Sequence, residues 1–197
     1  MSFNIGKKLA VISSNEPFDS DERIPLVLGP GRAFGSGEHE TTRSCLEELE
    51  NMPWILIKTV LDLGCGTGIL AITAVKLGAH SVTAIDPNPF AVETTIANVK
   101  LNAAEDQIKI LQGELHDLKD ERFDLIMANL YGDVLQDLVS EIPVFLNPGG
   151  YLLLSGMHYE YHYELKTGFV EMGLTLLKNR MLEEYTTLIF KKGPKRK

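Results

Sequence analysis

Apolar stretches typical of buried strands alternate with helical segments over most of the chain from residue 59 onward. The stretches that predict strands are residues 59–64, 81–86, 108–113, 123–130 and 149–156. The segments with apolar residues at helical spacing are residues 69–79, 89–103, 132–146 and 159–173. Residues 174–192 then predict two strands with no helix between them, which is the pattern of a hairpin.

This alternation predicts a doubly wound α/β fold. Strands that alternate with helices pair in parallel through right-handed crossovers. Because the strands are almost continuously apolar, we expect helices on both faces of the sheet. The expected sheet is seven-stranded and mostly parallel, with an antiparallel strand contributed by the C-terminal hairpin. Ligands of such folds bind beyond the carboxyl ends of the strands, near the point where the strand order reverses.

The first forty residues follow a different pattern, of short strands and turns. Residues 8–14 and 24–31 contain apolar runs, and a glycine-rich loop follows at residues 31–42. Apolar spacing then predicts a helix over residues 41–52 with Thr41 or Thr42 as its N-cap. We expect one domain, residues 1–197, made of short strands and a lid loop (1–40), a catalytic α/β core (41–192) and a basic tail (193–197).

Composition excludes several classes of protein. The chain has 197 residues, of which 44% are hydrophobic and 23% charged, as in an ordinary soluble domain. No apolar stretch approaches the length of a membrane span, and the N-terminus lacks the apolar region of a secretory signal. We therefore expect a cytoplasmic protein with no membrane partner.

The charge of the chain bears on its partners. The net charge is −8, and the last seven residues carry five positive charges and no negative one, so the rest of the chain is more acidic still. Nucleic-acid binding needs a basic surface, so we expect none. A basic protein or a small cation suits an acidic body better.

No pattern of cysteine or histidine predicts a metal site. Cys45 and Cys65 do not form a C-x-x-C pair. His158 and His162 stand four residues apart on a predicted helix, but they lack an H-E-x-x-H motif and a third ligand. We expect no metal, and we expect His39 to stabilise the glycine-rich loop through a hydrogen bond.

A glycine-rich motif, D-x-G-x-G-x-G, follows the strand at residues 59–64. Its glycines allow a tight turn and a close approach of a ligand to the backbone. The spacing is not the G-x-G-x-x-G of a dinucleotide site, and Asp62 precedes the glycines. This carboxylate would repel a pyrophosphate and attract an amino group or a sulfonium. Asp62, Gly64 and Gly66 therefore favour S-adenosylmethionine over NAD as the cofactor.

Two polar residues end strands of the predicted sheet. Asp86, 22 residues after Gly64, is placed to accept hydrogen bonds from both hydroxyls of a ribose, and Pro87, which follows it, is a further candidate for cofactor binding. Either cofactor would satisfy that spacing, and the alternative for Asp86 is a helix N-cap. Asn129 ends the strand at residues 123–130, where its side-chain carbonyl would accept a hydrogen bond from an amine substrate. The alternative for Asn129 is a turn residue.

Five segments together resemble one family. AFGSGEHETT, VLDLGCGTGILAI, AIDPNP, MANL and PGGYLLLSG look, in that order, like the PrmA family, the lysine methyltransferases of ribosomal protein L-eleven. Ser36 stands where the family usually has Thr, and the resemblance runs from about Phe3 to Lys192. It implies the catalytic domain of a class I, Rossmann-like methyltransferase that uses S-adenosylmethionine and releases S-adenosylhomocysteine.

The resemblance also implies roles for particular residues. The cofactor contacts of the family fall on Thr42, Gly64, Asp86 and Asn129, the loop that approaches the cofactor on Phe34 and Gly35, and the region that lines the adenine on Glu114. Asn129 is the implied catalytic residue, acting on lysine or N-terminal amino groups of a protein such as a ribosomal protein.

The substrate stays open at this point. Family members carry a separate N-terminal domain that recognises the ribosomal protein, and this sequence starts about where such a domain would end. Another protein, including an electron-transfer flavoprotein, or a small molecule is therefore an alternative substrate. The alternative activities are a nicotinamide-dependent oxidoreductase and a non-catalytic cofactor-binding module.

Overall fold

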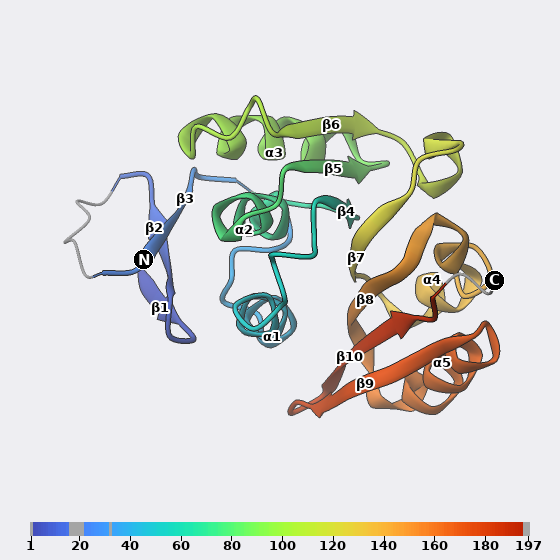
Figure 1. Ribbon diagram of the computed structural model, residues 1–197. Coiled ribbons are helices and arrows are strands. Elements are labelled where there is room, and N and C mark those ends of the chain that lie inside the picture. The colour runs from blue at the N-terminus through green and yellow to red at the C-terminus, as the bar shows by residue number, and fades with distance from the viewer. Residues whose placement is uncertain (1, 16–21, 32, 195–197) are drawn as a thin grey trace.

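The computed structural model describes residues 2–15, 22–31 and 33–194 (Figure 1). Within these ranges the main sheet has seven strands in the order β6-β5-β4-β7-β8-β10-β9. Their bounds are β4 Thr59–Leu63, β5 Ser81–Asp86, β6 Ile108–Gln112, β7 Phe123–Asn129, β8 Leu146–His158, β9 Leu174–Met181 and β10 Tyr185–Lys192. Only β10 runs antiparallel to its neighbours, so the predicted sheet is confirmed in the part of the chain that is described.

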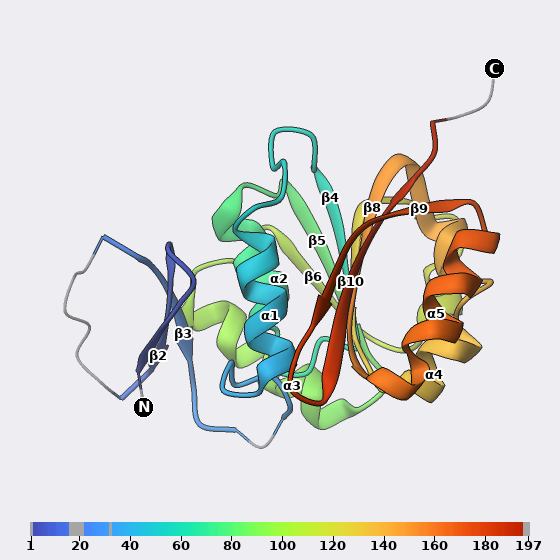
Figure 2. The same cartoon turned by 90° about the horizontal axis from the view of Figure 1, so that it is seen from below.

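Helices cover both faces of this sheet, as the apolar strands predict (Figures 1 and 2). Their bounds are α1 Glu40–Leu49, α2 Ile69–Leu77, α3 Pro89–Leu101, α4 Gly132–Asp137 and α5 Tyr159–Glu171. The first three pack on one face and the last two on the other. Because successive strand residues point to opposite faces, Val60 joins the core under α2 while Leu61 and Leu63 join the core under α5.

A separate small sheet stands beside the helices α1 to α3 (Figure 2). It consists of β1 (Phe3–Ile5), β2 (Leu9–Ser13) and β3 (Ile24–Leu28), with β1–β2 antiparallel and β2–β3 parallel. Asn98 of α3 and Asn102, the C-cap of that helix, bond to the segment formed by β3 and Gly29: Asn102 accepts from Val27 N–H at 3.0 Å, and Asn98 accepts from Gly29 N–H at 2.8 Å. The apolar runs predict β2 and β3, whereas β1 is too short to show a pattern.

The structure corrects two predicted helices. The helix expected over residues 41–52 ends at Leu49, and its N-cap is His39 rather than Thr41 or Thr42, which lie buried in its first turn. The helix expected over residues 132–146 is instead the short α4 followed by the 3-10 turn η2 (Ile142–Phe145). Pro143 cannot donate an N–H to the carbonyl four residues before it, which disfavours a continuous helix through this segment. Of the predicted basic tail, residues 195–197 lie outside the described residues.

Candidate functional site

The glycine motif forms the turn between β4 and α2. Gly64, Gly66 and Gly68 have φ of 74°, 56° and 77°, which L side chains rarely adopt. A β-carbon at Gly64 would also collide with the Leu130 side chain, and one at Gly66 with the carbonyl oxygen of Phe34. At the carboxyl end of the sheet, the turn therefore lies close to the backbone of Phe34 and to the side chain of Leu130.

Asp86 connects this turn to the start of α3. One carboxylate oxygen accepts the N–H of Gly66 at 3.0 Å, and the other accepts the N–H of Asn88 at 2.9 Å. Asn88, not Asp86, is the N-cap of α3, because its side chain accepts the N–H of Phe90. Each oxygen of Asp86 keeps a second lone pair, so the half-buried carboxylate retains two acceptor positions.

Asp62 lies beneath the turn and is only 1% exposed. Its carboxylate accepts the N–H of Ala71 in α2 at 3.0 Å. Burial is the main cause that raises the pKa of Asp62, the Ala71 hydrogen bond opposes it, and the negative charge of Asp86 adds a smaller increase, so that the pKa is about 7. This group would act on a ligand through the turn rather than by direct contact.

The loop that contains Phe34 and Gly35 is tied to the glycine turn by one residue. Thr67 donates its N–H to the carbonyl of Phe34 at 2.9 Å and its hydroxyl to the carbonyl of Gly35 at 2.6 Å. Asn98 of α3 then donates to the carbonyl of Thr67 at 2.8 Å. Residues far apart in the sequence thereby fix the predicted lid loop against the site.

A cavity of about 410 Å³ opens at this end of the sheet. It brings together six of the predicted residues, namely Phe34, Gly64, Gly66, Asp86, Pro87 and Asn129. Further lining comes from residues that include His39, Thr41, Leu130, Tyr131, Val134, Gly156 and Tyr185.

Four predicted residues do not line this cavity. Gly35 contributes a carbonyl to Thr67, and Asp62 lies under the turn. Thr42 is buried behind Asn129. Glu114 is exposed and caps the 3-10 turn η1 (Leu115–Leu118), with Asp117 accepting its N–H at 2.9 Å.

Asn129 lines the cavity and carries an unpaired acceptor. Its amide nitrogen donates to the hydroxyl of Thr42 at 3.3 Å, and this hydrogen bond sets the orientation of the amide. Its Oδ1 is buried and has no hydrogen-bond partner among the described residues. Buried acceptors are normally satisfied, so this oxygen is suited to a ligand that brings a donor. Gly156 leaves the space for it, since a β-carbon there would lie 2.9 Å from Oδ1.

Sequence reasoning missed Tyr185, which lines the cavity together with His39 and the predicted Phe34. His39 confirms its expected hydrogen bond, because its Nδ1 lies 2.8 Å from the Thr41 hydroxyl and accepts the Thr41 N–H. Its ring also contacts Phe34 at 5.3 Å and Tyr185 at 5.1 Å between centroids. Nothing in the local pattern around Tyr185 signals this contact, because it joins residues 146 positions apart in the chain.

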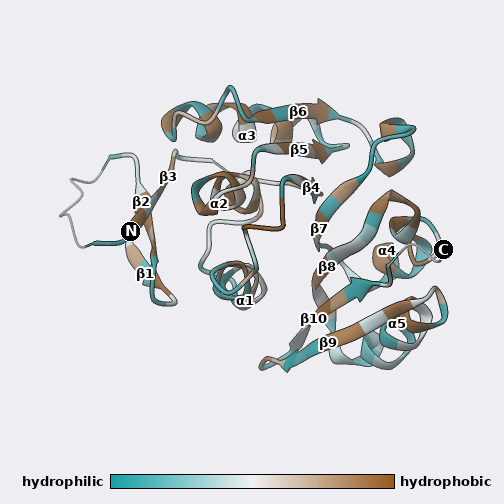
Figure 3. Cartoon of the chain, in the orientation of Figure 1, coloured by the Kyte–Doolittle hydropathy of each residue, from teal (hydrophilic) through white to brown (hydrophobic). Residues whose placement is uncertain are grey.

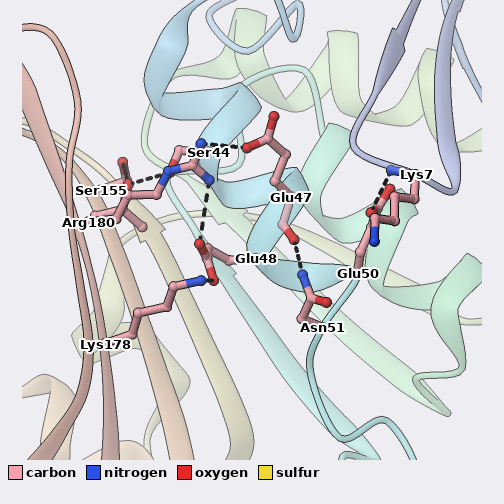
Figure 4. A network of polar contacts seen from close by, with 10 residues as sticks. Lys7, Ser44, Glu47, Glu48, Glu50, Asn51, Ser155, Lys178 and Arg180 are labelled. Atoms are coloured by element: carbon pink, nitrogen blue, oxygen red, sulfur yellow. Dashed lines mark hydrogen bonds and ion pairs between the residues drawn. The ribbon is translucent and has the colours of Figure 1, made fainter.

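Helix α1 holds the site to both ends of the molecule (Figure 4). Glu50 accepts the N–H groups of Lys7 and Lys8 at 2.9 and 2.8 Å, next to the small sheet. Glu48 is 3% exposed and pairs with Lys178 of β9 at 2.7 Å. In Figure 3, α2 is mostly brown while α1 carries more teal, which fits a helix that makes polar contacts on several sides.

The described residues were searched for metal-binding clusters and for membrane-spanning helices. In these residues, no group of three or more His, Cys, Asp or Glu side chains is placed to hold a metal ion. His158 ends β8 instead of lying on a helix with His162, so the predicted helical pair is wrong. Within the same ranges, no helix combines the length and apolar character that a membrane crossing requires.

Comparisons with known proteins point to one family. The family model "Ribosomal protein L11 methyltransferase (PrmA)" matches residues 2–193. The enzyme of that name from Pelobacter propionicus is 39% identical, over 96% of this chain and 62% of its own length. The one from Anoxybacillus flavithermus is 38% identical, over 90% and 56%. The chain thus spans about three fifths of the length of these relatives.

A solved structure shares the fold over nearly all of the chain. The crystal structure of ribosomal protein L11 methylase from Lactobacillus delbrueckii subsp. bulgaricus has a TM-score of 0.90 at 29% identity, and the match covers 98% of both chains.

Proposed function

The chain belongs to the PrmA family of ribosomal protein L11 methyltransferases, and from this we propose that it transfers a methyl group from S-adenosylmethionine to an amino nitrogen of a ribosomal protein. The observation that carries the proposal is the shared cavity of Asp86 and Asn129, in which Asn129 presents a buried acceptor without a partner. We also propose that residues 1–197 act as one methyltransferase domain in the cytoplasm.

The residues at one end of the cavity fit the cofactor. Asp86 would accept the two ribose hydroxyls at its remaining lone pairs, because each oxygen so far accepts one N–H. Gly64 and Gly66 would let the ligand approach the backbone, with Phe34 and Pro87 beside it. Gly35, Thr42 and Asp62 would support these contacts from behind.

At the other end, Asn129 would position the acceptor nitrogen. The chemistry that S-adenosylmethionine supplies when bound is an activated methyl group on a sulfonium sulfur. Oδ1 of Asn129 would accept an N–H of the amine and point the nitrogen lone pair at that methyl carbon. Thr42 fixes which atom of the amide faces the cavity. Asn129 would thus hold the nitrogen that receives the methyl group.

A lysine amine must lose a proton before it reacts, since its ordinary pKa is about 10.4. Desolvation in the cavity disfavours the charged ammonium and so lowers that pKa. We propose that water takes the proton, because none of Asn129, Leu130 and Tyr131 is a strong base.

Isothermal titration of the purified protein with S-adenosylmethionine, and separately with NADH, tests the cofactor. We expect micromolar binding of the methyl donor, no binding of NADH, and a Kd that rises at least about tenfold in Asp86→Ala through loss of charge-assisted hydrogen bonds. Binding of NADH in place of the methyl donor would overturn the proposal.

Mass spectrometry of purified ribosomal protein L11 after incubation with enzyme and cofactor tests the transfer. We expect mass increases of one or more methyl groups on amino nitrogens, with turnover strongly reduced in Asn129→Ala. Unchanged turnover and cofactor affinity in that variant would contradict the role of Asn129. Cofactor binding with no transfer would instead favour a non-catalytic module.

A further inference from the structure

Tyr185 stands at the acceptor end of the cavity. It begins β10, and three strands, β4, β7 and β8, separate β10 from β5, which carries Asp86. Asn129, at the end of β7, lies between these two positions in the strand order. If Asp86 binds the cofactor, the side of the cavity that Tyr185 lines is left to the substrate.

The ring of Tyr185 is held from two directions. The imidazole of His158 stacks on it, with 4.2 Å between centroids and 27° between planes. The imidazole of His39 meets it at 5.1 Å and 72°. His39 is itself fixed as the N-cap of α1. The half-buried ring of Tyr185 therefore has a defined position before any ligand arrives.

The backbone next to Tyr185 is fixed as well. The carboxylate of Glu40, the first residue of α1, accepts the N–H of Glu183 at 2.9 Å and that of Glu184 at 3.2 Å. The carbonyl of Glu184 accepts the N–H of Tyr159 at 3.3 Å. The β9–β10 turn is thus attached both to α1 and to the start of α5.

We propose that Tyr185 is a specificity-determining residue, whose ring forms the wall along which the side chain of the acceptor lysine lies. This assignment rests on the proposed function and adds a residue to it. A lysine has an apolar stem of four methylene groups and a cationic end, and an aromatic face attracts both. The ring would guide the stem so that the amine reaches Asn129, without contacting the cofactor.

Steady-state kinetics with purified ribosomal protein L11 as the acceptor, together with titration of S-adenosylmethionine, tests the assignment. For Tyr185→Leu we expect the KM for the acceptor to rise about tenfold, while kcat and the Kd for the cofactor change little. Tyr185→Phe keeps the aromatic face and should restore the KM. The matched control is Tyr163→Leu, since Tyr163 is exposed on α5 and does not line the cavity.

A second variant covers the case in which Tyr185→Leu does not fold. His158 lies outside the cavity lining but stacks on Tyr185, so His158→Ala should raise the acceptor KM to a smaller extent. An unchanged KM in whichever variant folds would overturn the assignment. A weaker cofactor Kd in Tyr185→Leu would also overturn it, by placing the ring in the cofactor site. Wild-type protein that binds no S-adenosylmethionine would overturn the proposed function itself, and this assignment with it.

Discussion

Asp62 carries a carboxyl group that burial makes difficult to ionise. Its pKa is about 7 in the folded protein and about 3.8 in the unfolded chain, so the folded state holds the proton more tightly between these values. The free energy of unfolding therefore falls as the pH rises from about 4 to about 7 and stays low above that range. Each unit of pKa difference corresponds to about 1.4 kcal/mol.

Asp62→Asn should remove this penalty. The amide oxygen can still accept the N–H of Ala71. From pH 5 to pH 8 the stability of the variant relative to the wild type should improve by on the order of 2 kcal/mol, measured by urea unfolding at both values. The control is Asp124→Asn. Burial opposes the lowered pKa of Asp124, but hydrogen bonds from Lys58, Thr59 and Asn147 outweigh it, so the group is ionised in both states across this window. An Asp62→Asn effect that does not vary with pH would contradict the argument.

Thr67 makes the contact that orders the loop of Phe34 and Gly35. Thr67→Val keeps the shape of the side chain but removes the hydroxyl that donates to Gly35. One lost hydrogen bond of about 1 kcal/mol should weaken the binding of S-adenosylmethionine about fivefold, and Thr67→Ser should restore it. Thr94→Val serves as the control in the same titration, because the Thr94 hydroxyl donates within α3, to the carbonyl of Phe90. Equal affinities for Thr67→Val and the wild type would show that the loop does not need this contact.

The candidate site was predictable where its residues follow a strand in a recognisable motif. Gly64, Gly66, Asp86 and Asn129 all end strands or follow them directly, and the structure brings them to one cavity. The contact of Tyr185 with His39 could not be predicted, because it depends on β10 lying beside β8 at the far side of the sheet. The position of Glu114 outside the cavity depends on the local turn η1, which no pattern marks.

At the scale of elements, α1 connects parts of the fold through buried polar contacts as well as through apolar packing. Thr41, Ser44 and Glu48 are all buried in it. The hydroxyl of Ser44 lies 2.8 Å from that of Thr187 in β10, and Glu48 pairs with β9. Hydrophobic periodicity does not report such long-range polar contacts. The sequence therefore predicts the helix but not its contacts with β9 and β10. The strands, by contrast, follow directly from the apolar runs that burial on both faces requires.

Glu50, just after α1, connects the helix to the small sheet, and Glu50→Gln should weaken that connection. One carboxylate oxygen becomes an NH₂ group that faces the N–H groups of Lys7, Lys8 or Leu9. We expect faster hydrogen exchange in residues 3–13 and a loss of about 1–3 kcal/mol in the free energy of unfolding. Exchange in β4 and β7 should change little. Glu47→Gln, at a more exposed ion pair with Arg180, should cost less than about 1 kcal/mol. Equal exchange in the two variants would rule out a specific role for Glu50.

At the scale of the whole molecule, the acidic chain and the cavity favour the same kind of partner. The net charge of −8 gives a long-range attraction for a basic protein, while the cavity would provide short-range contacts for the proposed acceptor amine. The first attraction is screened by salt, because the Debye length falls below about 10 Å above 0.1 M ionic strength. Contacts inside the cavity are screened much less.

The two contributions can be separated by ionic strength. We expect the KM for a basic acceptor such as a lysine-rich peptide to rise several-fold between 50 and 300 mM KCl, because salt screens the attraction that speeds association. The Kd for S-adenosylmethionine and the kcat should change little, because we propose that they depend on Asp86 and Asn129 inside the cavity. A peptide of zero net charge with one lysine is the matched control, and its KM should not respond. A salt response that is the same for both peptides would show that the charge of the body does not select the partner, and that recognition depends on the cavity alone.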